Sequence, residues 1–301
     1  VMLLSRSSPS ANVPCMTATQ VPQLENTFCG AQGLSLFYQA WYPLEAAKAV
    51  VALVHGFGEH CDRYGTVTTA LTQAGYAVFG FDNQGHGRSE GQRGHIDRWQ
   101  DYRDNVSAFL AKVRHHEPTL PLFVLGHSLG ALIVLDFALI TPQGLKGIIV
   151  SGPPILPVGI AKPYLVAIAR ILSGVWPRFS MDVGAGAETL SRDPAIVNQT
   201  QDDPLTHSMA TVRWGTECLV AIAAVRRTIT QLQVPILLLH GSADKVNDVK
   251  GSQEIFERIS LTDKTLKVYP GSYHEPHNDL DRNQVMYDIV QWLNGHLAKH
   301  P

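Results

Sequence analysis

Cysteine is scarce in this chain of 301 residues, which has only Cys15, Cys29, Cys61 and Cys218. None of the four forms a CxxC pair, and their spacing matches no disulfide framework or cysteine-rich metal site. We therefore expect free thiols and a cytoplasmic protein, because a reducing compartment keeps cysteines unpaired, with a single extracellular disulfide as the alternative.

Long apolar runs are also missing. The longest candidate, residues 155–176, is interrupted by prolines, glycine and charged residues, whereas a membrane-spanning helix needs about 20 apolar residues. Only a few apolar residues precede Ser5, too few for a secretory signal. We expect residues 1–20 to form a flexible leader outside the fold, and no segment to span a membrane.

Neither sign of charge dominates, because 24 Lys and Arg stand against 26 Asp and Glu, for a formal net charge of −2. Without a basic tract, nucleic acid is not an expected partner. The 13 histidines raise the question of a metal site. There is no HExxH, however, and the pair His274 and His277 is separated by Pro276, which disrupts helical ligand spacing. Gly56 and Gly58 lack the third glycine of a dinucleotide fingerprint. We expect neither metal nor cofactor.

Short runs rich in Val, Ile, Leu and Phe alternate with helical patterns, which predicts an α/β fold with a mostly parallel central sheet flanked by helices. The predicted strands are a hairpin within 28–42 that turns at Gln32 and Gly33, then 49–54, 76–81, 120–125, 145–150, 236–239 and 265–269. The predicted helices are 63–74, 97–116, 129–140, 246–259 and 278–297.

About eighty residues interrupt this alternation. Residues 152–233 contain helical and loop-like sequence but no convincing strand. We expect them to form a helical cap inserted into a core made of 21–151 and 234–301.

The sequence Gly126-His127-Ser128-Leu129-Gly130 lies between a predicted strand and a predicted helix. A G-x-S-x-G in that position is typical of a nucleophile elbow, whose turn is so tight that only glycine fits two residues on either side of the serine. Ser128 is therefore the candidate nucleophile.

A serine nucleophile needs a base and a carboxylate that orients the base, here in the chain order serine, acid, histidine. Asp244 follows the strand at 236–239 and is the candidate acid, with Asp248 as the alternative. His274 follows the strand at 265–269 and is the candidate base, with His277 as the alternative.

The oxyanion of acyl transfer needs two backbone donors. One is the N–H of Leu129, directly after the serine. The other is expected in the loop after the strand at 49–54, where Gly56 and Gly58 let the backbone approach the site. We assign it to the N–H of Phe57.

Five segments together resemble the monoacylglycerol lipase and lysophospholipase-like branch of the α/β-hydrolases. They are residues 55–60 (HGFGEH), 85–91 (GHGRSEG), 126–130, 241–244 (GSAD) and 273–277 (YHEPH), and the match in order and spacing runs from about residue 28 to the C-terminus. The resemblance implies an α/β-hydrolase fold with a cap, and the same triad and oxyanion donors.

The resemblance further implies that Glu59, Arg63 and His277 surround a glycerol-like leaving group. An ion pair between Glu59 and Arg63 that only steadies the loop is an equal alternative. The chain departs from the family where a cap tyrosine often precedes Asp-Pro-Leu, because Gln199-Thr200-Gln201 stands there before Asp203-Pro204-Leu205.

Apolar residues recur at helical spacing in the first part of the cap. Tyr164, Leu165, Ile168, Ile171 and Leu172 are candidates for lining an acyl tunnel, and the alternative is plain packing within the cap. The remaining apolar face is expected to touch membranes or micelles transiently.

The predicted function is hydrolysis of monoacylglycerols or similar single-chain lipid esters through an acyl-enzyme, with no obligate protein partner. The alternatives are a lysophospholipase, a broad carboxylesterase or thioesterase, and an aminopeptidase that would use Glu59 or Glu217 to hold the substrate's ammonium group.

Overall fold

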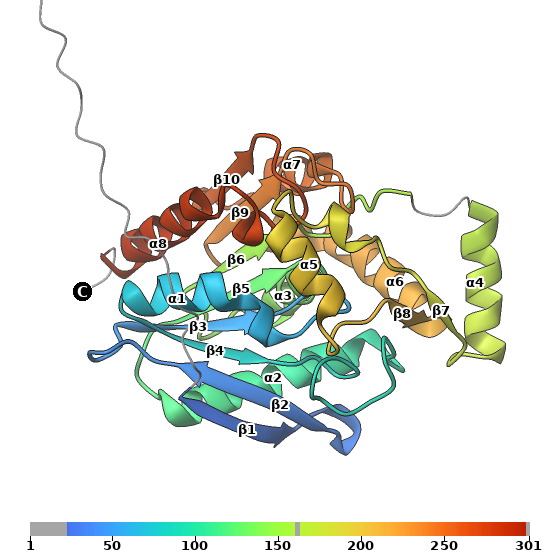
Figure 1. Ribbon diagram of the computed structural model, residues 1–301, viewed down its shortest axis with the longest axis horizontal. Coiled ribbons are helices and arrows are strands. Elements are labelled where there is room, and N and C mark those ends of the chain that lie inside the picture. The colour runs from blue at the N-terminus through green and yellow to red at the C-terminus, as the bar shows by residue number, and fades with distance from the viewer. Residues whose placement is uncertain (1–22, 160–162, 299–301) are drawn as a thin grey trace, which may run out of the picture.

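The computed structural model describes residues 23–159 and 163–298, so the expected leader at 1–20 lies outside the described residues. An eight-stranded sheet forms the centre, in the order β1-β2-β4-β3-β5-β6-β9-β10 (Figure 1). Its strands are β1 (Leu24–Cys29), β2 (Ser35–Trp41), β3 (Ala49–Val54), β4 (Tyr76–Phe81), β5 (Leu122–His127), β6 (Gly147–Ser151), β9 (Ile236–Gly241) and β10 (Lys264–Tyr269).

The sheet is mostly parallel, as the sequence predicted. Only β1 with β2 and β2 with β4 pair antiparallel. The five other pairings are parallel. The hairpin turns where predicted, with Gln32 and Gly33 both at positive φ. The parallel arrangement brings the carboxyl ends of β3, β5, β9 and β10 to one edge of the sheet.

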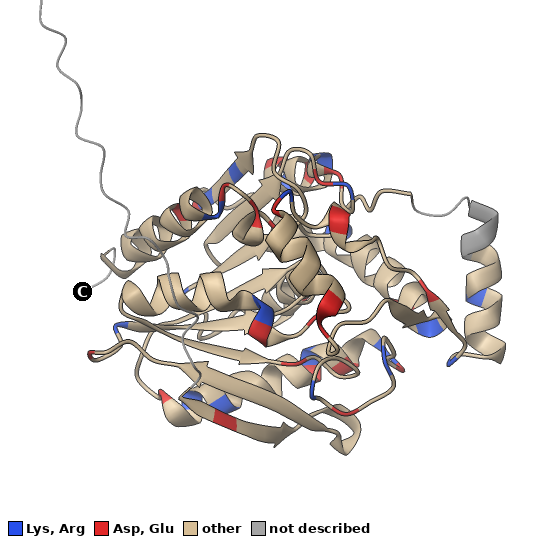
Figure 2. Ribbon diagram, in the orientation of Figure 1, with Lys and Arg blue, Asp and Glu red and all other residues tan. Residues whose placement is uncertain are grey.

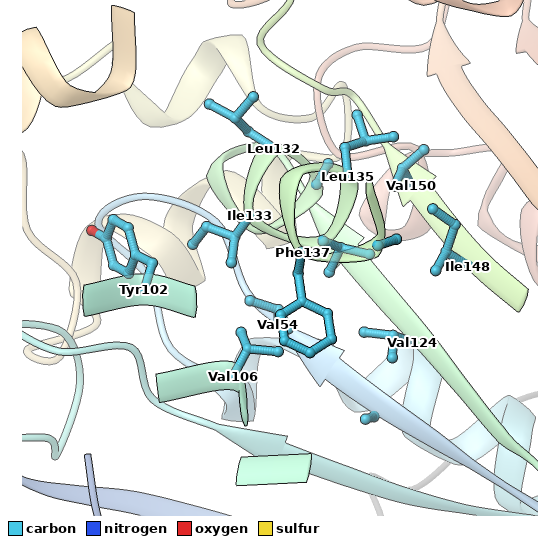
Figure 3. Close-up of a cluster of buried hydrophobic side chains, with 14 of the residues drawn as sticks. Val54, Tyr102, Val106, Val124, Leu132, Ile133, Leu135, Phe137, Ile148 and Val150 are labelled. Carbon is cyan, nitrogen blue, oxygen red and sulfur yellow. The ribbon is translucent and has the colours of Figure 1, made fainter. Parts of the chain in front are cut away.

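Helices cover both faces, which explains why β3, β4, β5, β6 and β9 are buried along their whole length. The core helices are α1 (Gly65–Gln73), α2 (Trp99–His116), α3 (Leu129–Ile140), α7 (Val249–Arg258) and α8 (Arg282–Ala298). Side chains of α1 and α8 pack on one face, and those of α2, α3 and α7 on the other. In Figure 3, Ile133 and Phe137 of α3 point toward Val54 and Val106, within the hydrophobic core on the face that α2, α3 and α7 cover.

Four of the five predicted helix starts lie too early in the chain, by two residues for α1 and α2, three for α7 and four for α8. Asp248 is the N-cap of α7, where its carboxylate accepts the backbone N–H of Lys250 at 2.9 Å. A short 3-10 turn, Pro276–Asn278, precedes α8 and contains a proline at its first position. In both places the loop that carries a candidate site residue is longer than predicted.

The segment between β6 and β9 corrects one expectation. It contains α4 (Pro163–Val175), α5 (Pro194–Asp202) and α6 (Val212–Thr228), but also two strands, β7 (Ser180–Asp182) and β8 (Met209–Thr211). These strands pair antiparallel over three residues each. They are too short for an alternating pattern to be recognised from sequence. We call this segment the cap.

Two further observations concern the whole chain. Cys29, Cys61 and Cys218 are free thiols, while Cys15 lies outside the described residues. Within the described ranges, no helix has the length and apolar character needed to cross a membrane.

Candidate active site

Ser128 stands at the turn from β5 into α3, in a backbone conformation that few residues other than glycine adopt. Its φ is 51° and its ψ is −116°. The flanking glycines make this turn possible. A Cβ on Gly126 would lie 2.4 Å from the carbonyl oxygen of Gly130, and one on Gly130 would lie 2.0 Å from that of Val54. The strained turn holds the serine hydroxyl at the carboxyl edge of the sheet.

Ser128, His274 and Asp244 form one hydrogen-bonded chain. Nε2 of His274 lies 2.9 Å from Oγ of Ser128, and Nδ1 lies 2.8 Å from Oδ2 of Asp244. Because an ionised carboxylate only accepts hydrogen bonds, Nδ1 carries the imidazole proton and Nε2 is free to accept the proton of the serine. The structure thus brings together three side chains that are 146 and 30 residues apart in sequence.

Asp244 is held in its ionised form. Burial opposes its charge, but the charge of His274 and hydrogen bonds from His240, His274 and the backbone N–H of Asn247 outweigh burial and lower the pKa of this carboxyl. Its second oxygen accepts the N–H groups of Val246 and Asn247 at 2.7 and 2.9 Å. An acid fixed in this way can orient an imidazole and stabilise its cation.

Burial favours the neutral imidazole of His274, but the neighbouring Asp244 carboxylate raises the pKa of His274 above its ordinary value. His274 can therefore accept a proton readily.

The alternative acid and base do not take part in this chain. Asp248 caps α7, as described above. His277 is buried and stacks on the ring of Tyr64, with the ring centroids 4.9 Å apart. Burial lowers the pKa of His277 to about 4, and His277 does not line the cavity at Ser128. The structure thus places His277 behind Tyr64, and its contact with a leaving group stays a prediction.

Phe57 and Leu129, the candidate oxyanion donors, both line the cavity at Ser128. No backbone or side-chain acceptor in the described part of the chain engages either N–H. The loop that carries Phe57 passes close to the serine, since a Cβ on Gly56 would lie 3.2 Å from Cβ of Ser128. The two donors are available for an oxyanion formed at that carbon.

The hydroxyl of Ser128 opens into a cavity of about 870 Å³ beneath the cap. Much of its wall is apolar and comes from α3, α6 and the segment around β8, including Leu132, Ala210, Val212, Trp214, Leu219 and Ile222. A cavity of this size and character can bury a long acyl chain.

Helix α4 contributes differently from what the sequence predicted. Among the side chains of this helix that the structure describes, those of 167–175, only Ala169 lines the cavity. Ile168 and Ile171 are 55% and 71% exposed, and Leu172 does not line the cavity either. The side chains of Tyr164 and Leu165 lie outside the described part. Ser173 faces inward, where its hydroxyl bonds to that of Thr216 of α6 at 3.0 Å, whereas Ile168, Ile171 and Val175 are exposed.

Glu59 and Arg63 line the cavity within a buried polar network. The guanidinium of Arg63 lies 3.3 Å from Glu59 and donates to both oxygens of Glu275, at 3.0 and 2.9 Å. It also donates to the hydroxyl of Thr200 from α5 at 2.6 Å. Tyr64 donates to Glu59 at 2.7 Å. Glu59 and Arg63 therefore form the ion pair that was the alternative to a role in binding the leaving group, and both side chains also line the cavity.

Sequence reasoning missed Glu275 and Thr200. Glu275 stands next to His274, so its position in the chain was a usable signal. Thr200 carried no signal, because a side chain on a cap helix is brought to Arg63 only by tertiary folding. Glu217, an alternative ammonium contact, accepts the backbone N–H of Trp99 at 2.8 Å and does not line the cavity.

Comparison with known proteins agrees with this geometry. Residues 45–281 match a family model described as "Serine aminopeptidase, S33". The monoacylglycerol lipase of Mycolicibacterium smegmatis is 32% identical over 274 residues, covering 91% of this chain and 98% of the relative. The monoglyceride lipase of Rattus norvegicus is 34% identical over 295 residues, covering 96% and 97%.

A solved structure shows the same fold. The monoglyceride lipase of Saccharomyces cerevisiae, crystallised as a soluble variant with a substrate analogue, superposes with a TM-score of 0.82 at 27% identity, covering 95% of this chain and 99% of that one. The chain therefore belongs to this serine hydrolase family of the α/β-hydrolase fold, together with the bacterial and mammalian monoacylglycerol lipases.

Proposed function

We propose that this protein hydrolyses monoacylglycerols, with Ser128 as nucleophile, His274 as base and Asp244 as the acid that orients it. The observation that carries the proposal is the hydrogen-bonded chain of these three side chains at the wall of a large, mostly apolar cavity. The names of the relatives support the same substrate class.

In the first half-reaction, Oγ of Ser128 attacks the ester carbonyl carbon while its proton passes to Nε2 of His274. The N–H groups of Phe57 and Leu129 hold the oxyanion. The carbon–oxygen bond to glycerol then breaks, and His274 returns the proton to the glycerol oxygen. In the second half-reaction water attacks the acyl-enzyme with His274 again as base, which releases the fatty acid and restores Ser128.

The wall formed by Glu59, Arg63 and Thr200 is the proposed place for the glycerol head group. In this part of the cavity wall, the guanidinium of Arg63 donates hydrogen bonds to both Glu59 and Thr200. Against the aminopeptidase alternative, Glu59 is already engaged by Arg63 and Tyr64. An ammonium group would find no carboxylate free of partners there.

The test compares wild type, Ser128→Ala and the matched control Ser107→Ala, an exposed serine on α2. Monoolein, lysophosphatidylcholine, an aminoacyl anilide and an ester chain-length series are the substrates. We expect Ser128→Ala to lose roughly 10⁴-fold or more in kcat on monoolein, and the control to keep full activity. A cavity of this size accommodates long chains. Activity that peaks on acetyl or butyryl esters and is lost on esters of about twelve carbons would therefore refute a long-chain substrate.

We also propose that the cap touches lipid surfaces through α4. Ile168, Ile171, Val175 and the adjoining Trp176 are 55%, 71%, 82% and 59% exposed, although all four are large and apolar. Figure 2 shows α4 at the edge of the molecule with few charged residues along it. An amphipathic helix with such a face partitions into the interface of a bilayer.

Co-sedimentation with phosphatidylcholine vesicles tests this contact. The double variant Ile171→Ser and Val175→Ser should bind roughly thirtyfold more weakly, because each substitution removes about 1 kcal/mol of apolar burial. Leu44→Ser is the matched control, since Leu44 is fully exposed in the loop between β2 and β3. Equal vesicle binding by the double variant and the wild type would exclude α4 as the contact.

A further inference from the structure

The cap holds the loop that carries the proposed oxyanion donor. We call residues 55–59 the oxyanion loop. The ring of Phe57 packs against Trp214 of α6, with ring centroids 4.4 Å apart, and edge-on against His207, at 5.5 Å. Both partners belong to the cap and both line the cavity. The side chain of the residue that supplies the N–H is thus in contact with the cap.

The backbones of the loop and the cap are in contact as well. The N–H of His207 donates to the carbonyl of Gly58 at 2.9 Å. A Cβ on Gly58 would lie 2.1 Å from the carbonyl oxygen of His207, so only glycine permits this approach. The position of the loop is therefore coupled to residues 207–214 through both side chain and main chain.

Trp214 is itself well anchored. Its indole N–H donates to the hydroxyl of the buried Tyr102 at 3.0 Å, and its backbone N–H donates to the N-cap Thr211 at 3.2 Å. Thr211 in turn donates its backbone N–H to Gly94 at 2.9 Å. The face of the indole that meets Phe57 is thus fixed by the core of the protein and by the start of α6.

Anchoring matters because an oxyanion donor acts only when its N–H is correctly placed, and an error of about 1 Å at a reacting group can cost 10²-fold in rate. Phe57 lies beyond the end of β3, where no strand pairing holds its backbone. We propose that Trp214 is a positioning residue, which holds the N–H of Phe57 in the oxyanion hole by packing on its ring. This inference rests on the proposed function.

If Trp214 were only part of the apolar wall, its loss would weaken substrate binding and raise KM. A positioning role predicts a different result, namely a lower kcat and a weaker preference for an oxygen ester over the matching thionoester. In the thionoester, sulfur replaces the carbonyl oxygen and accepts hydrogen bonds poorly, so this preference reports on the oxyanion donors rather than on binding of the acyl chain.

The experiment measures monoolein and its thiono analogue with wild type, Trp214→Ala, Trp214→Phe, Phe57→Ala and the double variant of Trp214→Ala with Phe57→Ala. We expect Trp214→Ala to lower kcat by about ten- to a hundredfold, with the oxygen-to-sulfur ratio reduced. Trp214→Phe should restore most of the rate, because it keeps an aromatic face. The double variant should be no slower than the slower single variant, because both substitutions break the same contact.

Val220→Ala, at an exposed position of α6, is the control for changes in the helix itself. If Trp214→Ala does not fold, Trp214→Leu fills the space without the aromatic face and is expected to show the same loss. An unchanged oxygen-to-sulfur ratio, or independent effects of the two single substitutions, overturns the positioning role. Full activity of Ser128→Ala would instead overturn the proposed function, so the two failures are distinguishable.

Discussion

Replacing Arg63 with methionine tests how far the buried polar network stabilises the fold. The side chains of Arg63, Glu59 and Glu275 are 5%, 8% and 3% exposed. Methionine replaces the apolar stem of arginine but has no charge, so the variant leaves two carboxylates without their cation. Breaking a buried ion pair in this way costs about 3–5 kcal/mol. We expect a loss of about 4 kcal/mol in the free energy of unfolding near neutral pH.

The loss should depend on pH in a definite direction. In wild type, burial and the charge of Glu275 raise the pKa of Glu59. Burial also acts on Glu275, but the charge of Arg63, together with His277 and the hydrogen bond from Asn278, outweighs it and lowers the pKa of Glu275. Without Arg63 both carboxyls have pKa values above those of the unfolded chain, so the folded variant binds more protons. Its stability therefore falls as pH rises, and the deficit should be smaller at acidic than at alkaline pH.

Urea unfolding of wild type, Arg63→Met and the control Arg88→Met measures these differences. Arg88 pairs with Asp62, but the two side chains are 39% and 32% exposed, so this control should lose less than about 1 kcal/mol. Adding Glu275→Gln to Arg63→Met should recover part of the lost stability. The reasoning fails if Arg63→Met is no less stable than Arg88→Met, or if its deficit grows toward acidic pH.

Three other outcomes are expected. In a pH profile, kcat/KM should rise with pH through a transition above the ordinary histidine value of 6.5, because His274 must be neutral to act as base. Burial lowers the pKa of His274, but the charge of Asp244 and its hydrogen bond, with the charges of Glu275 and Glu59, raise it above that value. Asp244→Asn should move this transition to lower pH and reduce kcat roughly 10⁴-fold. Gly130→Ala should abolish activity and lower the melting temperature, since the added Cβ meets the carbonyl oxygen of Val54 at 2.0 Å. Phe109→Ala, which empties a fully buried ring site in the core, should cost about 3–5 kcal/mol in urea unfolding while leaving KM unchanged.

The middle of the central sheet was predictable because β3, β4, β5, β6 and β9 are covered on both faces. The ranges predicted for β3 and β4 match the structure residue for residue, and α3 matches as well. A strand buried along its whole length needs a continuous apolar run, which is visible without any knowledge of its neighbours. The expectation of Ser128 and Asp244 came from the same source, since each follows such a run, whereas His274 follows the partly exposed edge strand β10.

The cap was less predictable. The strands β7 and β8 are only three residues long and pair only with each other, so neither shows an alternating apolar pattern in the sequence. The apolar character of α4 was visible, but not which side of the helix faces inward. That depended on Ser173 meeting Thr216 of α6, a contact between residues 43 apart.

The amino-acid sequence by itself thus determined the α/β sheet, the elbow at Ser128 and the order of the candidate triad, because these follow from local apolar runs and from glycines at fixed spacing. Only the tertiary structure decided the surroundings of that site. It placed Glu275 and Thr200 on Arg63, His277 behind Tyr64 and Trp214 on Phe57. Such contacts join residues far apart in the chain, and the free energy that selects them comes from packing and from pairing of buried charges, which no local pattern records.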